Sequence, residues 1–338
     1  MIQLNDDKLF GRKISQLRFL CQSLFATFCI YVGWQFYSFY LWAIAPTDNA
    51  FVARPAAVEA FLPLGALVSL KRFILGAEFD TIHPAGLTIF ITAILISLLL
   101  RKSFCGWICP IGFSSNLAER FGKKIGILFP LPSWIDLPLL TIKYLLLGFF
   151  AYLILWEMGL KELTDFHRSP YNLISDAKML HFFLQPSVLA GSIMLGIVFF
   201  SFVIRNFWCR HLCPYGALLG IAALFSPLQV RRDPESCISC KKCEKICPAS
   251  IHITKRKTVR NCECIGCLEC VQACPVDDCL TIATPCKKRI KPLLLPAITI
   301  GLFLLCYLVA RLTGHWHSEI PVEVFQRYYQ MIGDIGHP

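Results

Sequence analysis

Charged residues are scarce in this sequence. Asp, Glu, Lys and Arg make up 16% of its 338 residues, whereas hydrophobic residues make up 56%. Soluble domains carry about 25% charged residues, so the composition excludes an ordinary soluble protein and is typical of an integral membrane protein. Basic residues outnumber acidic ones, 33 to 22, but they are scattered through loops beside apolar runs. Membrane topology explains that pattern better than nucleic-acid binding.

Nucleotide-binding motifs are also missing. The sequence has no Walker A loop and no Gly-x-Gly-x-x-Gly fingerprint, so we expect no nucleotide or flavin domain within this chain. A cleaved signal peptide is not expected either, because the apolar run from Phe19 is too long and Pro46 would directly follow the cleavage site. Reducing equivalents would therefore come from a partner or from lipid-soluble quinone.

Apolar runs long enough to cross a bilayer occur five times. They lie near residues 19–43, 84–100, 136–157, 184–204 and 292–311. The segment 54–73 is also apolar, but it carries Glu59, Pro63 and Gly65. These residues favour an interfacial or re-entrant helix over a sixth span.

The distribution of Lys and Arg predicts the orientation, because cytoplasmic segments are enriched in these residues. The first 18 residues together with segments 101–135 and 205–291 hold 24 of them, against 8 in the segments on the opposite side. The N-terminus and residues 205–291 are therefore predicted to be cytoplasmic. The C-terminal tail is predicted to lie on the periplasmic or outer side.

Two stretches between the fourth and fifth apolar runs share one cysteine spacing. Residues 237–248, CISCKKCEKICP, and 264–275, CIGCLECVQACP, both read Cys-x2-Cys-x2-Cys-x3-Cys-Pro. This is the bacterial ferredoxin pattern, in which the fourth cysteine ligates the other 4Fe–4S cluster, and it is a poor pattern for zinc. We assign one cluster to Cys237, Cys240, Cys243 and Cys274. We assign the second to Cys264, Cys267, Cys270 and Cys247.

These patterns predict the fold class and the domains. We expect an α-helical integral membrane protein with about five transmembrane helices and an internal repeat, carrying an inserted α+β ferredoxin module. Residues 1–225 would form a membrane core with four transmembrane helices, 226–290 the module, and 291–338 the fifth transmembrane helix with a short outer tail. A module of this size seldom builds a sufficient apolar core, so clusters would stabilise it.

Another motif is repeated where two apolar runs end. Residues 101–112, RKSFCGWICPIG, and 205–216, RNFWCRHLCPYG, each contain Cys-x3-Cys-Pro-x-Gly. The spacing places both thiols on one helical face, and the Pro suits the first turn of a new helix. We call Cys105, Cys109, Cys209 and Cys213 the membrane-motif cysteines. They would face each other as two half-sites of a further cluster or metal ion, or form redox-active dithiols; simple helix packing is the third alternative.

The remaining cysteines and the outer histidines carry weaker signals. Cysteines outside these patterns are expected to be small buried hydrophobes; they are Cys21, Cys29, Cys262, Cys279, Cys286 and Cys306. His83, His315 and His317 could bind a metal or pass protons from a quinol, although interfacial histidines are common without function. The tail after them reads as an amphipathic surface segment whose apolar face would meet lipid or protein; that face comprises Val324, Phe325, Tyr328, Tyr329 and Ile332.

Taken together, these motifs resemble the membrane polyferredoxins of the NapH type, which are quinol-oxidising components of periplasmic nitrate reductase systems. The layout is similar to the YccM-like branch over roughly residues 20–290, in particular at 54–73, at 83–87 (HPAGL) and at 205–220 (RNFWCRHLCPYGALLG). The chain lacks the outer flavin domain of the related NosR and the immunoglobulin-like domain of the related CcoG. It also adds a fifth span, which NapH proteins usually lack.

The resemblance implies electron transfer at a bacterial inner membrane. We expect a multi-pass carrier that exchanges electrons between quinone or quinol and a redox partner protein through two 4Fe–4S clusters, as a quinol dehydrogenase component. The sequence identifies no catalytic residue and no nucleic-acid partner. Two alternatives stay open: a copper reductase or assembly factor that uses the membrane-motif cysteines, and a redox-sensing membrane regulator.

Overall fold

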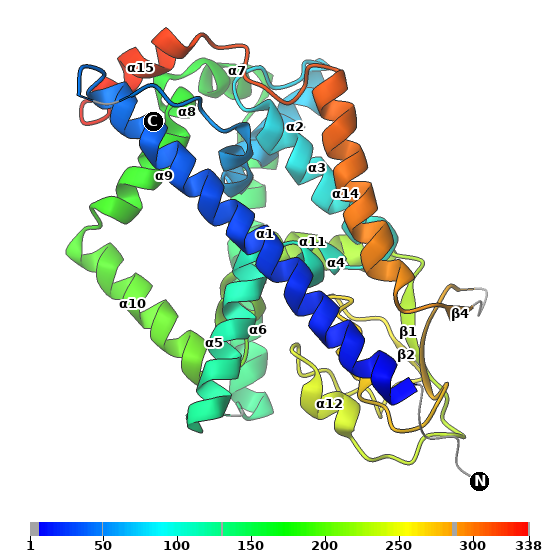
Figure 1. Ribbon diagram of the computed structural model, residues 1–338. Helices are drawn as coiled ribbons and strands as arrows, with labels where there is room; N and C mark the ends of the chain where they lie inside the picture. The colour runs from blue at the N-terminus through cyan, green and yellow to red at the C-terminus, as the bar shows by residue number, and fades with distance from the viewer. Residues whose placement is uncertain (1–6, 49, 130, 286–288, 337–338) are drawn as a thin grey trace. The chain divides into compact units, whose positions relative to one another are not determined.

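The computed structural model describes residues 7–48, 50–129, 131–285 and 289–336, most of which are helical (Figure 1). The chain divides into two compact units. Unit 1 comprises residues 1–26, 93–147 and 196–303, and unit 2 comprises residues 27–92, 148–195 and 304–338. Long helices contribute residues to both units; they are α1 (Asp7–Ile44), α3 (Pro84–Leu100), α6 (Ser133–Ala151), α10 (Val188–Val203) and α14 (Leu294–Leu312).

Among the residues that the structure describes, three helical segments are long and apolar enough to cross a membrane: Ile14–Ile44, Trp134–Glu157 and Leu294–Leu312. They coincide with the first, third and fifth predicted runs. The second run forms α3, which is a shorter apolar helix. The fourth run, near residues 184–204, forms α10, which reaches the length of a span only together with the preceding α9 (Ser175–Leu184), and these two helices meet at an angle of 80°. Pro186 lies in this break, where its ring disfavours helical geometry at the preceding residue.

Unit 1 contains the cysteine-rich module and the short helices beside it. The helical elements are α4 (Ser103–Trp107), α5 (Pro110–Ile125), the π-helix η3 (Trp208–Leu212), α11 (Pro214–Ala222), the 3-10 helix η4 (Ala223–Phe225), α12 (Lys242–Ile246) and α13 (Glu269–Gln272). An antiparallel sheet in the order β2-β1-β3-β4 completes the module. Its strands are β1 (Gln229–Arg232), β2 (Thr258–Val259), β3 (Leu280–Ala283) and β4 (Arg289–Ile290).

The core of unit 1 is continuous from apolar helices into the module. Ile96 of α3, Trp107 of α4, Leu219 of α11, Leu268 and Ile282 belong to one buried cluster. Val230 of β1 pairs with Val259 and Ile282, which fixes the register of the central strands. Because apolar burial is the main stabilising term, the module and these helices stabilise each other.

Unit 2 contains shorter helices around a separate core. They are the 3-10 helix η1 (Ala56–Phe61), α2 (Pro63–Gly76), the π-helix η2 (Tyr152–Glu157), α7 (Leu160–Arg168), α8 (Pro170–Leu173), α9 and α15 (Val322–Gln330). The segment predicted to be interfacial or re-entrant forms η1 and α2, which do not span a membrane in length. Phe325 and Tyr329 of α15 are buried with Phe39 and Ile174. These two residues of the tail therefore face protein.

Candidate functional site

A first cavity in unit 1 is lined by four cysteines of the repeated spacing: Cys237, Cys240, Cys243 and Cys274. The empty space there is about 320 Å³, open solvent included, and lies between the loop before α12 and the segment that leads into β3. Cys243 is buried, whereas Cys240 is exposed to solvent. We call this space the first cavity.

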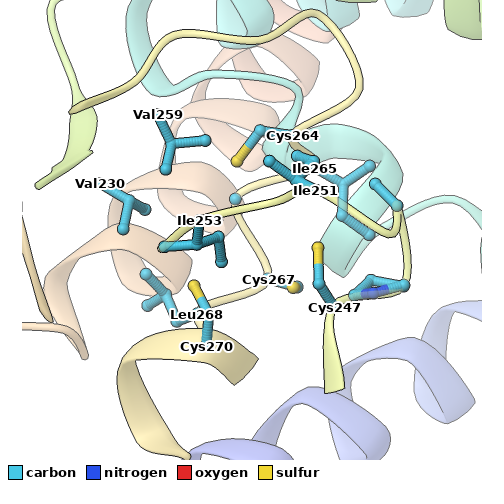
Figure 2. Close-up of a pocket in the computed structure, with 13 residues that line it drawn as sticks. Val230, Cys247, Ile251, Ile253, Val259, Cys264, Ile265, Cys267, Leu268 and Cys270 are labelled. Atoms are coloured by element: carbon cyan, nitrogen blue, oxygen red, sulfur yellow. The ribbon is translucent and has the colours of Figure 1, made fainter. Parts of the chain in front are cut away.

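A second cavity, of about 400 Å³, is lined by Cys247, Cys264, Cys267 and Cys270 (Figure 2). Figure 2 shows these thiols among apolar side chains that include Val230, Ile253 and Leu268. Cys247, Cys267 and Cys270 are each less than 10% exposed. The fourth cysteine of each stretch thus joins the cavity of the other stretch. This arrangement is the one that the assigned ligand sets require; iron ligation itself stays a prediction.

The two cysteine loops share an unusual backbone. Ser239 (φ 54°) and Lys241 (φ 56°) in the first loop, and Gly266 (φ 59°) and Leu268 (φ 64°) in the second, are all left-handed. These residues occupy equivalent places, immediately before and after the middle cysteine. Such a conformation costs about 1–3 kcal/mol per non-glycine residue. The repeated strain is the kind found at ligand-binding loops, and it lets three thiols turn toward one cavity.

The thiols of the second cavity need a cation to ionise. Burial raises the pKa of Cys267 to about 12 and raises that of Cys270 well above its ordinary value. A coordinating metal deprotonates such a thiol outright. No three His, Cys, Asp or Glu side chains in the described ranges are grouped tightly enough for a single metal ion; the ligands of a cubane bind separate irons around a larger volume. Four thiols in an otherwise apolar cavity therefore fit a 4Fe–4S cluster.

The membrane-motif cysteines differ in local structure from the prediction. Cys105 lies in α4 and Cys209 in η3, but both helices end before the second cysteine of the motif. Cys109 and Cys213 are extended residues that precede α5 and α11. The prediction that both thiols share one helical face is therefore wrong. The proline that follows each second cysteine disfavours the helical conformation there, while it begins the next helix as predicted.

The four thiols nevertheless lie near enough within unit 1 to interact electrostatically, although no three of them are grouped tightly enough for a single metal ion. Burial is the main cause that raises the pKa of Cys209 to about 12, and Cys109 and Cys213 raise it further. The pKa of Cys105 is well above its ordinary value, mainly because of burial. Cys105 also interacts electrostatically with the other three thiols. Burial alone would lower the pKa of Lys102, but Glu263 and three of these thiols raise it above its ordinary value. The cysteines of the two repeats thus interact with one another and with a buried cation.

The first copy of the membrane motif packs against the loop of the second cavity. The Trp107 Nε1–H donates to the carbonyl oxygen of Gly266 at 3.1 Å. The neighbouring Gly106 approaches Ile265 so closely that a Cβ atom would overlap the Ile265 carbonyl oxygen. Arg18 joins both sides, since it donates to the Gly106 carbonyl oxygen at 3.0 Å and pairs with Glu269 at 3.0 Å. The residue next to Cys105 therefore touches the loop that carries Cys264 and Cys267.

Sequence reasoning missed two features of unit 1. Cys279 is buried, as expected, but it also lines the first cavity. Lys143, inside an apolar helix, pairs with Glu263 at 2.5 Å, and the Tyr144 hydroxyl donates to the same carboxylate at 2.7 Å. A lysine inside an apolar run was the available signal, because such residues normally face a partner. Cys286 lies outside the described residues.

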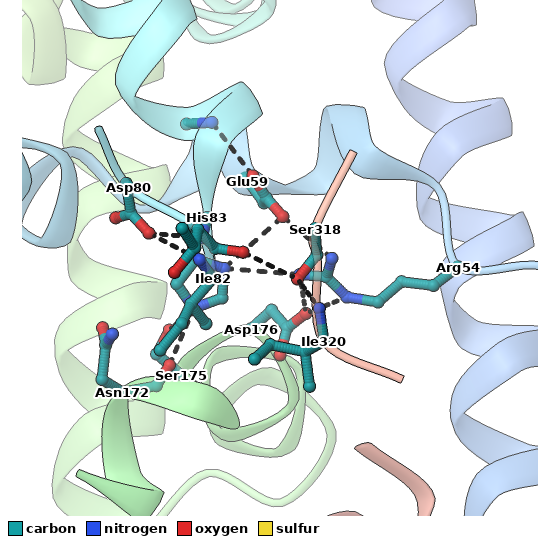
Figure 3. A network of polar contacts seen from close by, with 12 residues as sticks. Arg54, Glu59, Asp80, Ile82, His83, Asn172, Ser175, Asp176, Ser318 and Ile320 are labelled. Carbon is teal, nitrogen blue, oxygen red and sulfur yellow. Dashed lines mark hydrogen bonds and ion pairs between the residues drawn. The ribbon is translucent and has the colours of Figure 1, made fainter. Parts of the chain in front are cut away.

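The outer histidines are all in unit 2 and differ from one another. His83 is buried in a polar network (Figure 3), where its Nδ1 is 3.5 Å from Glu59 and its Nε2 is 2.7 Å from the carbonyl oxygen of Asn172. Arg54 holds the same network together, pairing with Glu59 at 2.8 Å and with Asp176 at 2.6 Å. His315 and His317 are exposed. The His315 ring packs on Phe79 with 4.5 Å between ring centroids.

Known proteins match the chain in both of its cysteine regions. The family described as "4Fe-4S binding domain" matches twice, at residues 82–127 and 186–232, so each match contains one membrane motif. The family described as "4Fe-4S dicluster domain" matches residues 229–275, which contain the ferredoxin-type stretches. With several long apolar helices, these matches define a ferredoxin-type 4Fe–4S membrane protein.

A relative that matches along almost the whole chain identifies the family. The putative electron transport protein YccM of Escherichia coli (strain K12) is 37% identical over 333 residues, which cover 96% of this chain and 91% of YccM. The uncharacterized protein MJ0749 of Methanocaldococcus jannaschii is 34% identical over 64% of this chain and 77% of its own length. The ferredoxin-type protein NapH of Haemophilus influenzae is 28% identical over 49% of this chain and 55% of NapH. No solved structure matches the chain. The chain belongs to the YccM family of ferredoxin-type electron transport proteins.

Proposed function

We propose that this chain is an inner-membrane electron carrier that passes electrons between the quinone pool and a redox partner protein through two 4Fe–4S clusters, one in each cavity. The observation that carries this proposal is the contact of Trp107 and Gly106 with the loop of the second cavity. When bound, each cluster takes up and releases one electron, so two clusters accept both electrons of a quinol, whose two protons pass to water.

The two cavities differ in their solvent exposure and in their distance from the membrane motif. The second cavity is buried and adjoins the membrane motif, whereas Cys240 exposes the first cavity to solvent. Interleaved ligands keep the two clusters close. Electrons would therefore exchange with the membrane side through the second cavity and with the soluble partner at Cys240.

We assign the membrane-motif cysteines to a third centre on the membrane side of the relay. Their electrostatic interaction with Lys102 supports this role, because a buried ammonium offsets the negative charge of thiolates. The membrane topology predicted from the distribution of Lys and Arg supports this placement. Five spans with a cytoplasmic N-terminus and module would put both motifs at the cytoplasmic surface.

Two measurements test the carrier. Protein purified anaerobically and placed in bilayers should change the redox state of its clusters when quinol or quinone is added; clusters that ignore both would contradict the proposal. Iron, sulfide and EPR should be measured on wild type and on a variant with Ser at all four membrane-motif cysteines. Two cubanes require about 8 iron atoms per chain in both proteins, and a wild-type excess that the variant lacks would identify the third centre.

A copper reductase is the second candidate, since thiolates suit Cu(I) and the four thiols interact electrostatically; a single copper ion would require them to move closer together than the structure places them. Wild type should then bind copper stoichiometrically, and Cys105→Ala or Cys209→Ala should abolish binding. Iron in place of copper at these thiols would exclude this candidate.

A further inference from the structure

A fifth cysteine lies in the first cavity. Cys279 lines it together with the four cysteines of the predicted ligand set, and it is 2% exposed. Its thiol interacts electrostatically with those of Cys237 and Cys274, which line the same cavity. Cys279 is therefore close to two of the four sulfurs that would hold the cluster.

The fold holds Cys279 firmly in this position. Asp278 is left-handed (φ 59°) and turns the chain back after Pro275, so that Cys279 directly precedes β3. The Asp233 amide donates to the carbonyl oxygen of Cys279 at 2.8 Å, which ties the residue to the end of β1. Its thiol donates weakly to the Asp233 carbonyl oxygen at 3.7 Å.

The second cavity offers no equivalent. Among the described residues that line it, the cysteines are the four of the predicted set. The two fourth cysteines, Cys274 and Cys247, occupy identical places in the repeated spacing. Cys274 and Cys247 are thus equivalent predicted ligands, and Cys274 has an additional cysteine, Cys279, in its cavity.

We propose that Cys279 is a reserve ligand of the cluster in the first cavity and binds the iron that Cys274 or Cys237 would otherwise hold. This inference rests on the two-cluster assignment made above. In the exchange, the Cys279 thiol gives its proton to water as its sulfur binds iron, and the sulfur that leaves takes up a proton. No electron is transferred. The reserve belongs to the cavity that solvent reaches at Cys240, where a cluster is most exposed to oxidants that remove iron.

The test compares the matched positions in the full-length protein. Wild type, Cys274→Ala, Cys247→Ala, Cys279→Ala and the double variant Cys274→Ala with Cys279→Ala are purified anaerobically and reconstituted with iron and sulfide. Iron per chain is counted, and EPR distinguishes three-iron from four-iron clusters. Alanine is used because a serine oxygen can itself bind iron.

We expect Cys279→Ala and Cys274→Ala to keep the iron content and four-iron EPR signal of wild type. Cys247→Ala, which has no reserve, should lose one iron and show a three-iron signal, and the double variant should show the same loss in the other cluster. If Cys274→Ala alone loses as much iron as Cys247→Ala, the proposal is wrong. Cys237→Ala, with and without Cys279→Ala, provides a second pair should Cys274→Ala misfold. A wild type with markedly fewer than about 8 iron atoms in its clusters would instead refute the two-cluster assignment, and the reserve ligand with it.

Discussion

Replacing Gly106 by Ala tests the contact between the membrane motif and the second cavity. The added Cβ would lie well inside 3.0 Å of the Ile265 carbonyl oxygen, a separation that real Cβ atoms essentially never show. That oxygen belongs to backbone between Cys264 and Cys267, and Gly266 beyond it is already left-handed, so the loop cannot yield without moving the predicted ligands. Overpacking of this kind costs about 1–3 kcal/mol.

The loss of stability in Gly106→Ala is reduced because alanine favours a helix more than glycine does. A glycine inside a helix is less stable than alanine by about 0.5–1 kcal/mol, which offsets part of the clash in α4. A net loss of about 1.4 kcal/mol corresponds to about a tenfold change in an equilibrium constant. We therefore expect a chelator to remove iron from the second cluster about tenfold faster in Gly106→Ala than in wild type, while the first cluster is unaffected.

The assay is iron release to a chelator under anaerobic conditions, followed by cluster absorbance and EPR. Gly33→Ala and Gly148→Ala are matched controls, because among the described residues no atom outside the glycine's own stretch of helix lies within 4 Å of a Cβ built at either residue. Equal release rates in Gly106→Ala and in the two controls would refute the packing that we infer between the membrane motif and the second cluster loop.

Two further predictions concern the buried network of unit 2. Arg54→Met leaves Glu59 and Asp176, both 0% exposed, without the arginine that pairs with them. Removing one partner of a buried pair costs about 3–5 kcal/mol. The unfolding temperature measured in detergent should therefore fall strongly in Arg54→Met, and Arg54→Lys should restore part of it. Burial alone would lower the pKa of His83, but Glu59 raises it above its ordinary value. Protonated His83 therefore contributes stability that is complete below about pH 6.5 and is lost as pH rises through the folded pKa. In wild type, the unfolding temperature should therefore decline as pH rises above about 6.5, and His83→Gln should make this decline smaller. If the pH dependence of the unfolding temperature is the same in both proteins, His83 is not its cause.

Local spacing explains what the sequence could predict. The four-cysteine sets follow from short covalent intervals, and the Pro residues at 110 and 214 mark helix starts in the structure as they do in the sequence. Apolar run length located the long helices for the same reason. Such features depend on few neighbours along the chain.

Features that depend on distant packing could not be predicted. Cys279 stands outside any repeated spacing, and only the path of the chain into β3 places it in the first cavity. Lys143 and Glu263 are 120 residues apart in the chain, so an unpaired lysine was visible but its partner was not. The fourth apolar run was predicted to begin near residue 184, but the helix α9 before it and the 80° bend between α9 and α10 were not predicted, because they depend on packing rather than on run length.

The position of Arg18 bears on the order in which the protein is made. This arginine is 4% exposed, and it contacts Glu269, which the ribosome adds 251 residues later. Until Glu269 has been synthesised, the first helix carries a cation without its final partner. Docking of the earliest segment to be synthesised thus waits on one of the last.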